Sequence, residues 1–216
     1  MNTNELVLQH IARRGKDSSS LLILLHGYGS NEQDMFGFAP VFDERFTIIS
    51  VRAPRAIPDN DYAWFDLAFT ANGDLTYESA QIIEAQQKLT QFIGEAAIAY
   101  SIEPKQIFLL GFSQGGMMSA LMALSKPELI RGAIVLSGWV PLEAHAMLAS
   151  PDQCSAINVF IGHGIFDDVV PVKQGRAARD TFAAFGVPHV YHEYATAHHI
   201  NEQCLDDVAT WLDPLI

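Results

Sequence analysis

The chain has 216 residues, nearly half of them hydrophobic, and a formal net charge of −12 at pH 7. This length suits one domain or at most two small ones, and we expect a single domain over residues 1–216. The acidic excess disfavours nucleic acid and anionic membrane surfaces as partners, because both would be repelled. A neutral or cationic small molecule fits better.

The N-terminal stretch and the cysteines indicate the compartment. Residues 1–16 mix polar and charged side chains with only short apolar runs, so we expect neither a signal peptide nor membrane insertion. Cys154 and Cys204 lie far apart without CxxC spacing, which is typical of reduced thiols rather than of a disulfide framework or a metal site. We therefore expect a cytoplasmic protein.

Apolar runs predict the strands of a central sheet, and periodic segments predict helices between them. An edge strand is expected within residues 5–11, and further strands at 21–25, 46–51, 107–110, 133–136, 157–161 and 190–194. Helices are expected at 31–42, capped by Ser30 or Asn31, and at 76–100, 117–124, 142–148, 172–185 and 201–212, with an irregular stretch at 56–74. Strands that alternate with helices in this way predict an α/β fold with a parallel sheet.

The segment around Ser113 reads G-x-S-x-G, between the strand at 107–110 and a helical run. This order predicts a nucleophile elbow, in which the glycines permit a sharp turn from strand to helix. Ser113 would then lie exposed at a helix N-terminus, where backbone N–H groups stabilise negative charge. A serine hydroxyl also needs a histidine base and an acid that orients the base.

The acid and base candidates each follow a separate strand. Residues 163–168 read H-G-I-F-D-D after the strand at 157–161, and His198-His199 follows the last strand. The carboxyl ends of parallel strands meet at one edge of a sheet, so these residues are expected to lie near Ser113. The order Ser, Asp, His is that of the α/β-hydrolases. No metal-binding or nucleotide-binding spacing is found, and His26 and His163 are expected to be structural.

Five motifs, taken in order, resemble the phospholipase/carboxylesterase family of small α/β-hydrolases, which includes acyl-protein thioesterases. They are L-L-H-G-Y-G-S-N-E-Q-D at 24–34, R-A-P with Y-A-W-F-D at 52–66, G-F-S-Q-G-G-M-M at 111–118, H-G-I-F-D-D-V-V-P at 163–171 and A-H-H-I at 197–200. The resemblance implies an α/β-hydrolase fold, with a mainly parallel sheet, helices on both faces and a minimal lid. It also implies a cytoplasmic esterase without cofactor that is often a homodimer.

Carried over by position, the resemblance implies a triad of Ser113, Asp167 and His198, with Asp168 and His199 as the neighbouring alternatives. The oxyanion would be held by the backbone N–H groups of Tyr28 and Gln114. Trp64 and Phe65 lie in a loop rich in aromatic residues, and ordinary core is one interpretation of two or more of these side chains. The resemblance instead favours an acyl groove lined by Trp64 and Phe65.

The expected activity is hydrolysis of short to medium acyl esters. The segment 138–155, where larger lipases place a lid, is short and contains Pro141 and Pro151, which favours a shallow, open site. The alternatives are a thioesterase for acyl-proteins or acyl thioesters, a lysophospholipase, and a hydrolase-like binding protein without catalysis. A serine peptidase is a weaker alternative. The sequence does not distinguish among acyl chains or leaving groups.

Overall fold

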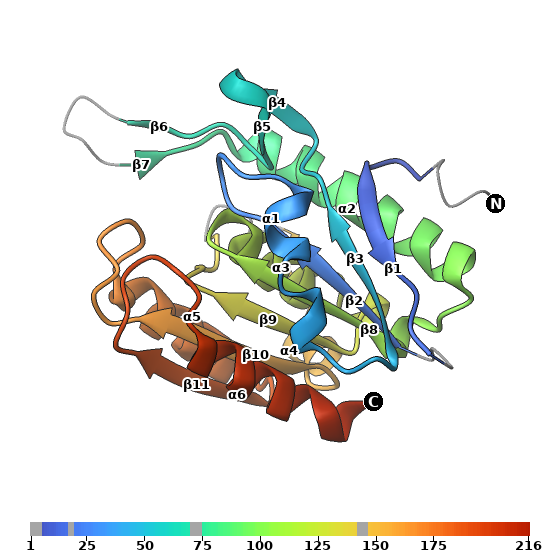
Figure 1. Cartoon of the computed structure of the whole chain (residues 1–216). Helices are drawn as coiled ribbons and strands as arrows, with labels where there is room; N and C mark the ends of the chain where they lie inside the picture. Colours follow the sequence, from blue (N-terminus) through green and yellow to red (C-terminus); the bar gives the residue numbers. More distant parts are fainter. Residues whose placement is uncertain (1–5, 17–19, 70–74, 142–146) are drawn as a thin grey trace.

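The computed structural model describes residues 6–16, 20–69, 75–141 and 147–216, and is shown in Figure 1. A seven-stranded sheet has the order β1-β3-β2-β8-β9-β10-β11. Its strands are β1 (His10–Arg13), β2 (Ser20–Leu25), β3 (Phe46–Val51), β8 (Ile107–Phe112), β9 (Gly132–Leu136), β10 (Asn158–Gly164) and β11 (His189–Tyr194). β1 pairs antiparallel with β3, and every other neighbouring pair in this sheet is parallel.

The helices cover both faces of the sheet, as expected. They are α1 (Glu32–Phe36), α2 (Ser79–Tyr100), α3 (Gln114–Ser125), α4 (Pro151–Cys154), α5 (Val172–Ala184) and α6 (Glu202–Leu212). Leu21, Ile23 and Leu25 of β2 belong to a core cluster with α2, α3 and α5. The alternate residues Leu22 and Leu24 pack on the other face, with α1 and α6. Successive side chains of a strand point to opposite faces of the sheet, and here both faces are buried. The central strands are therefore apolar throughout.

The parallel strands end at one edge of the sheet, and the loops after β8, β10 and β11 gather there (Figure 1). The register places Leu25, the last residue of β2, opposite Gly111 of β8. Because β2 and β8 are neighbours in the sheet, the loop after β2 begins beside the turn that contains Ser113. The loop after β11 ends at the same edge, so His198 lies beside Ser113 although the two residues are 85 positions apart in sequence.

The largest difference from the sequence-based expectation concerns residues 56–74. Four short strands occur around and within this stretch: β4 (Arg55–Ile57) pairs with β5 (Asp61–Ala63), and β6 (Ala68–Phe69) pairs with β7 (Leu75–Thr76). The second hairpin extends away from the body of the molecule in Figure 1. α3 also begins at Gln114 rather than at Met117, and α4 was not expected. The helix predicted at 142–148 falls mostly outside the described residues.

Two further features concern the helices and the cysteines. Within the part of the chain that the structure describes, no helix has the length and apolar character needed to cross a bilayer. Cys154 and Cys204 are both buried and unpaired. Burial raises the pKa of both thiols, that of Cys204 to about 12.

Candidate active site

The turn between β8 and α3 places Ser113 in a strained conformation. Its backbone lies at φ 55° and ψ −117°, a region that L-residues rarely adopt. The glycines around it make this turn sterically feasible. A Cβ on Gly111 would lie 2.0 Å from the carbonyl oxygen of Gly115, and one on Gly115 would lie 2.1 Å from that of Leu25. Strain of this kind often marks a functional site.

His198 connects Ser113 to Asp167. The Nε2 atom of His198 lies 2.9 Å from the Ser113 hydroxyl, and its Nδ1 lies 2.7 Å from Oδ2 of Asp167. The His198 side chain is 16% exposed, whereas the Asp167 side chain is fully buried. The three side chains come from the ends of three different strands, and their hydrogen bonds run in series from carboxylate to imidazole to hydroxyl.

The Asp167 carboxylate is held in place by its own loop. Its Oδ1 accepts the backbone N–H groups of Val169, at 3.0 Å, and Val170, at 2.8 Å. Burial on its own would raise the pKa of Asp167, but the hydrogen bonds from His198, Val170 and the Ser137 side chain outweigh it and hold that pKa below its ordinary value. The carboxylate is therefore ionised at neutral pH and accepts the Nδ1–H of His198.

The neighbouring alternatives point elsewhere. Asp168 is exposed. His199 instead contacts the hydroxyl of Thr196, with its Nδ1 3.1 Å from Oγ1. Only one residue of each pair is therefore hydrogen-bonded within the site. The structure brings Asp167 and His198 to Ser113, and it does not bring Asp168 or His199 there.

The two expected oxyanion donors belong to segments that adjoin Ser113. Gln114 is the first residue of α3, and Tyr28 belongs to the loop that follows β2. A Cβ built on Gly27 would lie 3.3 Å from the Cβ of Ser113, so this loop passes directly beside the serine. Neither the Tyr28 N–H nor the Gln114 N–H has an acceptor among the described residues. Both amides are therefore unpaired next to the serine.

Trp64 and Phe65 do not line an exposed groove, so this prediction is wrong. Both side chains are fully buried in the core cluster on the α2 and α3 face. The Trp64 indole donates to the carbonyl oxygen of His26 at 3.0 Å. The rings are in the core because burying them removes far more apolar surface from water than an open groove would. Through the indole hydrogen bond, Trp64 also supports the loop that begins at His26.

The Gln114 side chain has a contact that the sequence analysis did not anticipate. It is buried, accepts the Trp64 N–H at 2.8 Å and donates to the Phe65 carbonyl at 2.8 Å. These partners are about 50 residues away in sequence, so no local pattern could have indicated them. The residue after the serine therefore tethers the 64–65 segment to the elbow.

His26 and His163 are buried, and their hydrogen bonds are to backbone groups. His26 Nδ1 lies 2.7 Å from the Gly27 carbonyl, and its Nε2 accepts the Ala53 N–H at 3.0 Å. His163 Nε2 lies 2.7 Å from the Val170 carbonyl. Burial lowers the pKa of both imidazoles, so both are neutral at pH 7. This geometry agrees with structural roles.

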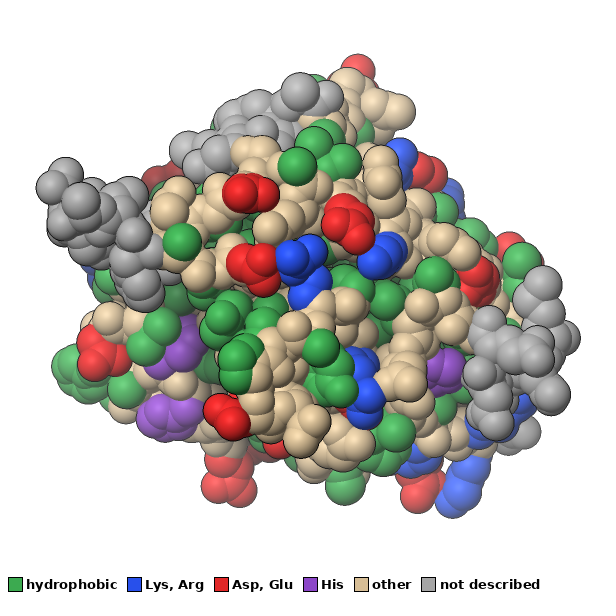
Figure 2. All heavy atoms as spheres, turned by 90° about the horizontal axis from the view of Figure 1, so that it is seen from above, with side chains coloured by type: hydrophobic (Ala, Val, Ile, Leu, Met, Phe, Trp, Pro, Cys, Tyr) green, Lys and Arg blue, Asp and Glu red, His purple; other side chains and the backbone are tan. Residues whose placement is uncertain are grey.

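Charges of both signs occur on the face of the molecule that Figure 2 shows. On the face seen in Figure 2, acidic and basic side chains lie next to one another near the centre. Arg55 and Asp66 form one of the surface ion pairs, at 2.8 Å. In the described ranges, no cluster of three or more His, Cys, Asp or Glu side chains has a metal-binding arrangement.

Comparison with known proteins places this geometry in context. The chain is 27% identical over 154 residues to the carboxylesterase SOBER1 of Arabidopsis thaliana, covering 69% of this chain and 66% of that protein. It is also 27% identical over 232 residues to acyl-protein thioesterase 1 of Cryptococcus neoformans, covering 95% of this chain and 96% of that one. The match thus spans slightly less than two thirds of the plant protein and nearly all of the fungal one.

Solved structures agree in fold. The carboxylesterase of Bacillus cereus superposes with a TM-score of 0.85 at 23% identity, over 99% of this chain and 97% of that one. Esterase PE8 superposes with a TM-score of 0.82 at 25% identity, over 97% and 98%. The model of the family described as Phospholipase/Carboxylesterase matches residues 7–216. The chain therefore belongs to the phospholipase/carboxylesterase family and has its α/β-hydrolase fold.

Proposed function

We propose that the protein is a serine carboxylesterase that hydrolyses short to medium acyl esters through an acyl-enzyme. The observation that carries this proposal is the position of His198 between Ser113 and Asp167, with hydrogen-bond distances of 2.9 and 2.7 Å. A base that touches both the hydroxyl and a buried carboxylate is what a serine nucleophile requires.

In the acylation step, the Ser113 oxygen attacks the acyl carbonyl while its proton moves to Nε2 of His198. The carbonyl oxygen becomes an oxyanion, which the N–H groups of Tyr28 and Gln114 stabilise. His198 then gives the proton to the departing alcohol, leaving an ester on Ser113. Water repeats the sequence in place of the serine and releases the carboxylic acid. Asp167 keeps the Nδ1–H tautomer and stabilises the imidazolium.

The accessibility of the site supports small, soluble substrates. Ser113 is partly exposed, and Tyr28 beside it is 42% exposed. A substrate can therefore reach the serine without displacing a packed segment. The homologous carboxylesterases in plants agree with the choice of ester.

Thioester hydrolysis is the second candidate. It is favoured by the acyl-protein thioesterase 1 of Cryptococcus neoformans, whose similarity extends over 95% of this chain. The same triad can attack a thioester carbonyl, since the first steps are identical and the leaving group is a thiol. A lysophospholipase would use the same steps on a glycerol ester.

The test is hydrolysis of p-nitrophenyl esters from acetate to palmitate by the native protein and by Ser113→Ala. We expect activity that peaks at short to medium chains, with kcat lower by about 10³-fold to 10⁶-fold in the variant. Comparable activity in Ser113→Ala would contradict the mechanism. A rate that rises to palmitate, or that is found only with thioesters, would favour the acyl-protein or lipid alternatives.

A fluorophosphonate probe separates the enzyme from a binding protein of the same fold. The probe reacts only with an activated serine, so we expect labelling of the native protein and none of Ser113→Ala. Failure to label the folded native protein would favour the non-catalytic alternative.

A further inference from the structure

The loop that carries Tyr28 is held mainly by contacts with other segments of the chain. It joins β2 to α1 and spans residues 26–31. Tyr28 is 42% exposed, and Gly29 adopts a positive φ of 73°. A loop with an exposed side chain at its critical residue depends on its neighbours for a fixed position. Contacts from neighbouring segments hold both ends and the middle of this loop.

Two consecutive residues after β3 hold both ends. Ala53 donates its N–H to Nε2 of His26 at 3.0 Å, which fixes the start of the loop. Arg52 holds the end through Glu32, the first residue of α1. Its guanidinium donates from Nε to Oε2 at 2.7 Å and from Nη2 to Oε1 at 2.5 Å. Such a bidentate pair fixes both distance and orientation.

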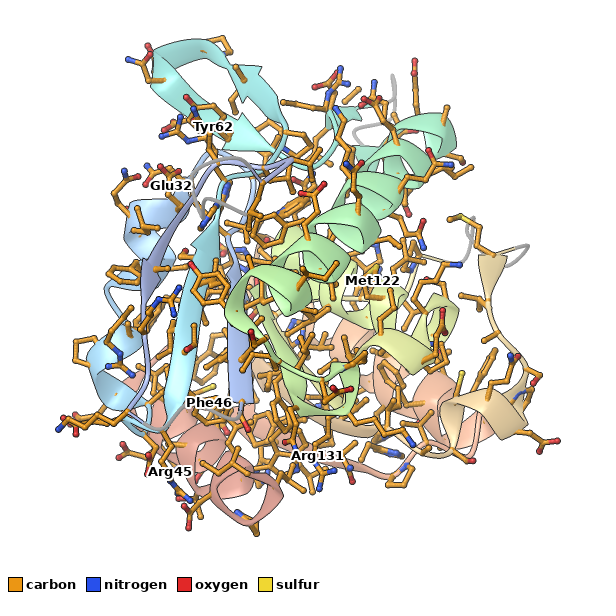
Figure 3. The ribbon with its side chains drawn as sticks, turned by 90° about the vertical axis from the view of Figure 1, so that its right-hand side faces the viewer. Glu32, Arg45, Phe46, Tyr62, Met122 and Arg131 are labelled. Atoms are coloured by element: carbon orange, nitrogen blue, oxygen red, sulfur yellow. The ribbon has the colours of Figure 1, made fainter. Side chains whose placement is uncertain are left out.

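Tyr62 of β5 holds the middle. The Gly29 N–H donates to the Tyr62 carbonyl at 3.1 Å, and the Tyr62 N–H donates to the Ser30 carbonyl at 3.0 Å. Arg52 also contacts this tyrosine: Nη1 donates to its hydroxyl at 3.2 Å, and the guanidinium lies 4.5 Å from the ring centroid. Figure 3 shows Glu32 and Tyr62 at the same end of the molecule, on α1 and β5 respectively.

The Arg52–Glu32 pair is too enclosed to be an ordinary surface ion pair. The Glu32 side chain is 4% exposed and that of Arg52 is 26% exposed. Burial on its own would raise the pKa of Glu32, but the hydrogen bonds from Arg52 outweigh it and the pKa is lowered. Removing one partner of a buried pair leaves an uncompensated charge, whereas exposed pairs usually contribute little.

We propose that Arg52 is a positioning residue which, through Glu32 and Tyr62, holds the Tyr28 N–H where the oxyanion forms. This inference rests on the proposed function, since it concerns the same oxyanion site. The oxyanion exists only in the tetrahedral species and its transition states. Loosening the loop should therefore lower kcat while leaving KM nearly unchanged.

The experiment compares Arg52→Met, Arg52→Lys and Glu32→Gln with the native protein in ester hydrolysis. For Arg52→Met we expect kcat to fall by about 10-fold to 100-fold, below the ~10²-fold to 10³-fold cost of deleting an oxyanion donor outright. KM should change by less than about twofold, because ground-state binding is unaffected. Arg52→Lys and Glu32→Gln retain one hydrogen bond, so their losses should be smaller.

Arg45→Met provides the matched control. Arg45 also pairs with two carboxylates, Asp43 at 3.0 Å and Asp213 at 2.6 Å, but its side chain is 49% exposed. Figure 3 shows it at the opposite end of the molecule from Glu32 and Tyr62. We expect native kcat and KM for this variant. An equal kcat loss in Arg45→Met would show that loss of any ion pair suffices, and would overturn the inference.

A transition-state analogue separates positioning from general destabilisation. A trifluoromethyl ketone forms a tetrahedral adduct with Ser113 and places an oxyanion between the two N–H groups. Its inhibition constant should weaken in the Arg52 and Glu32 variants by the same factor as kcat/KM. Measurements are made below the unfolding temperature of each variant, determined by circular dichroism. If Arg52→Met does not fold, Arg52→Lys and Glu32→Gln are tested by the same criterion.

Unchanged kcat in the folded variants, or analogue binding that does not follow kcat/KM, would refute the role of Arg52. The native protein and Ser113→Ala are assayed alongside. Ser113-dependent hydrolysis that is insensitive to the Arg52 and Glu32 changes would leave the esterase proposal intact. Absence of Ser113-dependent hydrolysis and of analogue binding in the native protein would instead contradict the proposed function itself.

Discussion

The side-chain amide oxygen of Gln114 accepts the backbone N–H of Trp64 at 2.8 Å, which joins the elbow to the segment beneath the site. The same side chain donates to the Phe65 carbonyl at 2.8 Å. Gln114→Ala would leave both buried backbone groups unpaired. We expect the free energy of unfolding to fall by about 2 kcal/mol or more, measured by urea denaturation. The backbone N–H of residue 114 is kept in this variant.

Gln91→Ala is the control for that prediction. Gln91 lies on the exposed side of α2, where its amide donates to Glu95 at 2.7 Å. The expected change in the free energy of unfolding is within about 0.5 kcal/mol. If the free energy of unfolding fell equally in the two variants, the buried hydrogen bonds of Gln114 would contribute no more to stability than an exposed one.

The elbow glycines predict a steep steric cost. In Gly115→Ala the new methyl group would lie 2.1 Å from the backbone oxygen of Leu25, so α3 and β2 would have to separate. We expect destabilisation of about 3 kcal/mol or failure to fold. Gly94→Ala, within α2, meets no atom within 4 Å and should instead stabilise by up to about 1 kcal/mol. Thermal unfolding of both proteins, followed by circular dichroism, tests this difference in sign.

Asp167 gives a prediction for pH dependence. Its pKa is lower in the folded protein than in the unfolded chain. The stability that it contributes is therefore present above about pH 4, the ordinary range of aspartate, and is lost as the pH falls through the lowered folded value. We therefore expect the free energy of unfolding of Asp167→Asn to fall less on acidification than that of the native protein. Urea denaturation at a series of pH values measures this difference.

The same variant should lose about 10³-fold to 10⁴-fold in kcat, because asparagine does not hold the His198 tautomer. The native carboxylate stays ionised between pH 5 and 8, so the variant should be the less active protein throughout that range. A kcat for Asp167→Asn near the native value would argue against the orienting role. Asp168→Asn is the control and should retain activity, since Asp168 is exposed.

Trp64 provides a test of the corrected role of the aromatic loop. Trp64→Phe removes the indole hydrogen bond to the His26 carbonyl and keeps a large buried ring. We expect a loss of about 1 kcal/mol in the free energy of unfolding and an unchanged preference among p-nitrophenyl esters. A shifted chain-length preference would show that this ring touches the acyl chain after all.

Much of the sheet was readable from sequence because its strands are buried on both faces. The run at 21–25 is continuously apolar, the run at 46–51 is apolar or β-branched except for Ser50, and β3 has the predicted bounds. β4 to β7 were not predicted, since strands of two or three residues show no period. The start of α3 was placed late because Gly115 and Gly116 disfavour helix locally, and close packing against β2 outweighs this.

Some residues of the site were likewise predicted from the sequence, and others were not. Ser113, Asp167 and His198 were predicted to lie together because each follows a strand within a recognisable motif, and the structure brings the three side chains into contact. Trp64 was assigned incorrectly because the sequence pattern of an aromatic residue in a long loop is the same whether the ring lines a groove or packs in the core. Arg52 and the Gln114 side chain bind partners that are distant in sequence. Such contacts cannot be predicted from one amino-acid sequence.

The two buried cysteines bear on how the ester and thioester alternatives can be told apart. Thiols released from a thioester are usually followed with a disulfide reagent that reacts with thiolates, so a reactive protein thiol would add background. Cys204, with its pKa raised to about 12, and the buried Cys154 have almost no thiolate at neutral pH. Any colour formed with the folded protein therefore comes from the substrate, and the slow turnover of a poor thioester becomes measurable.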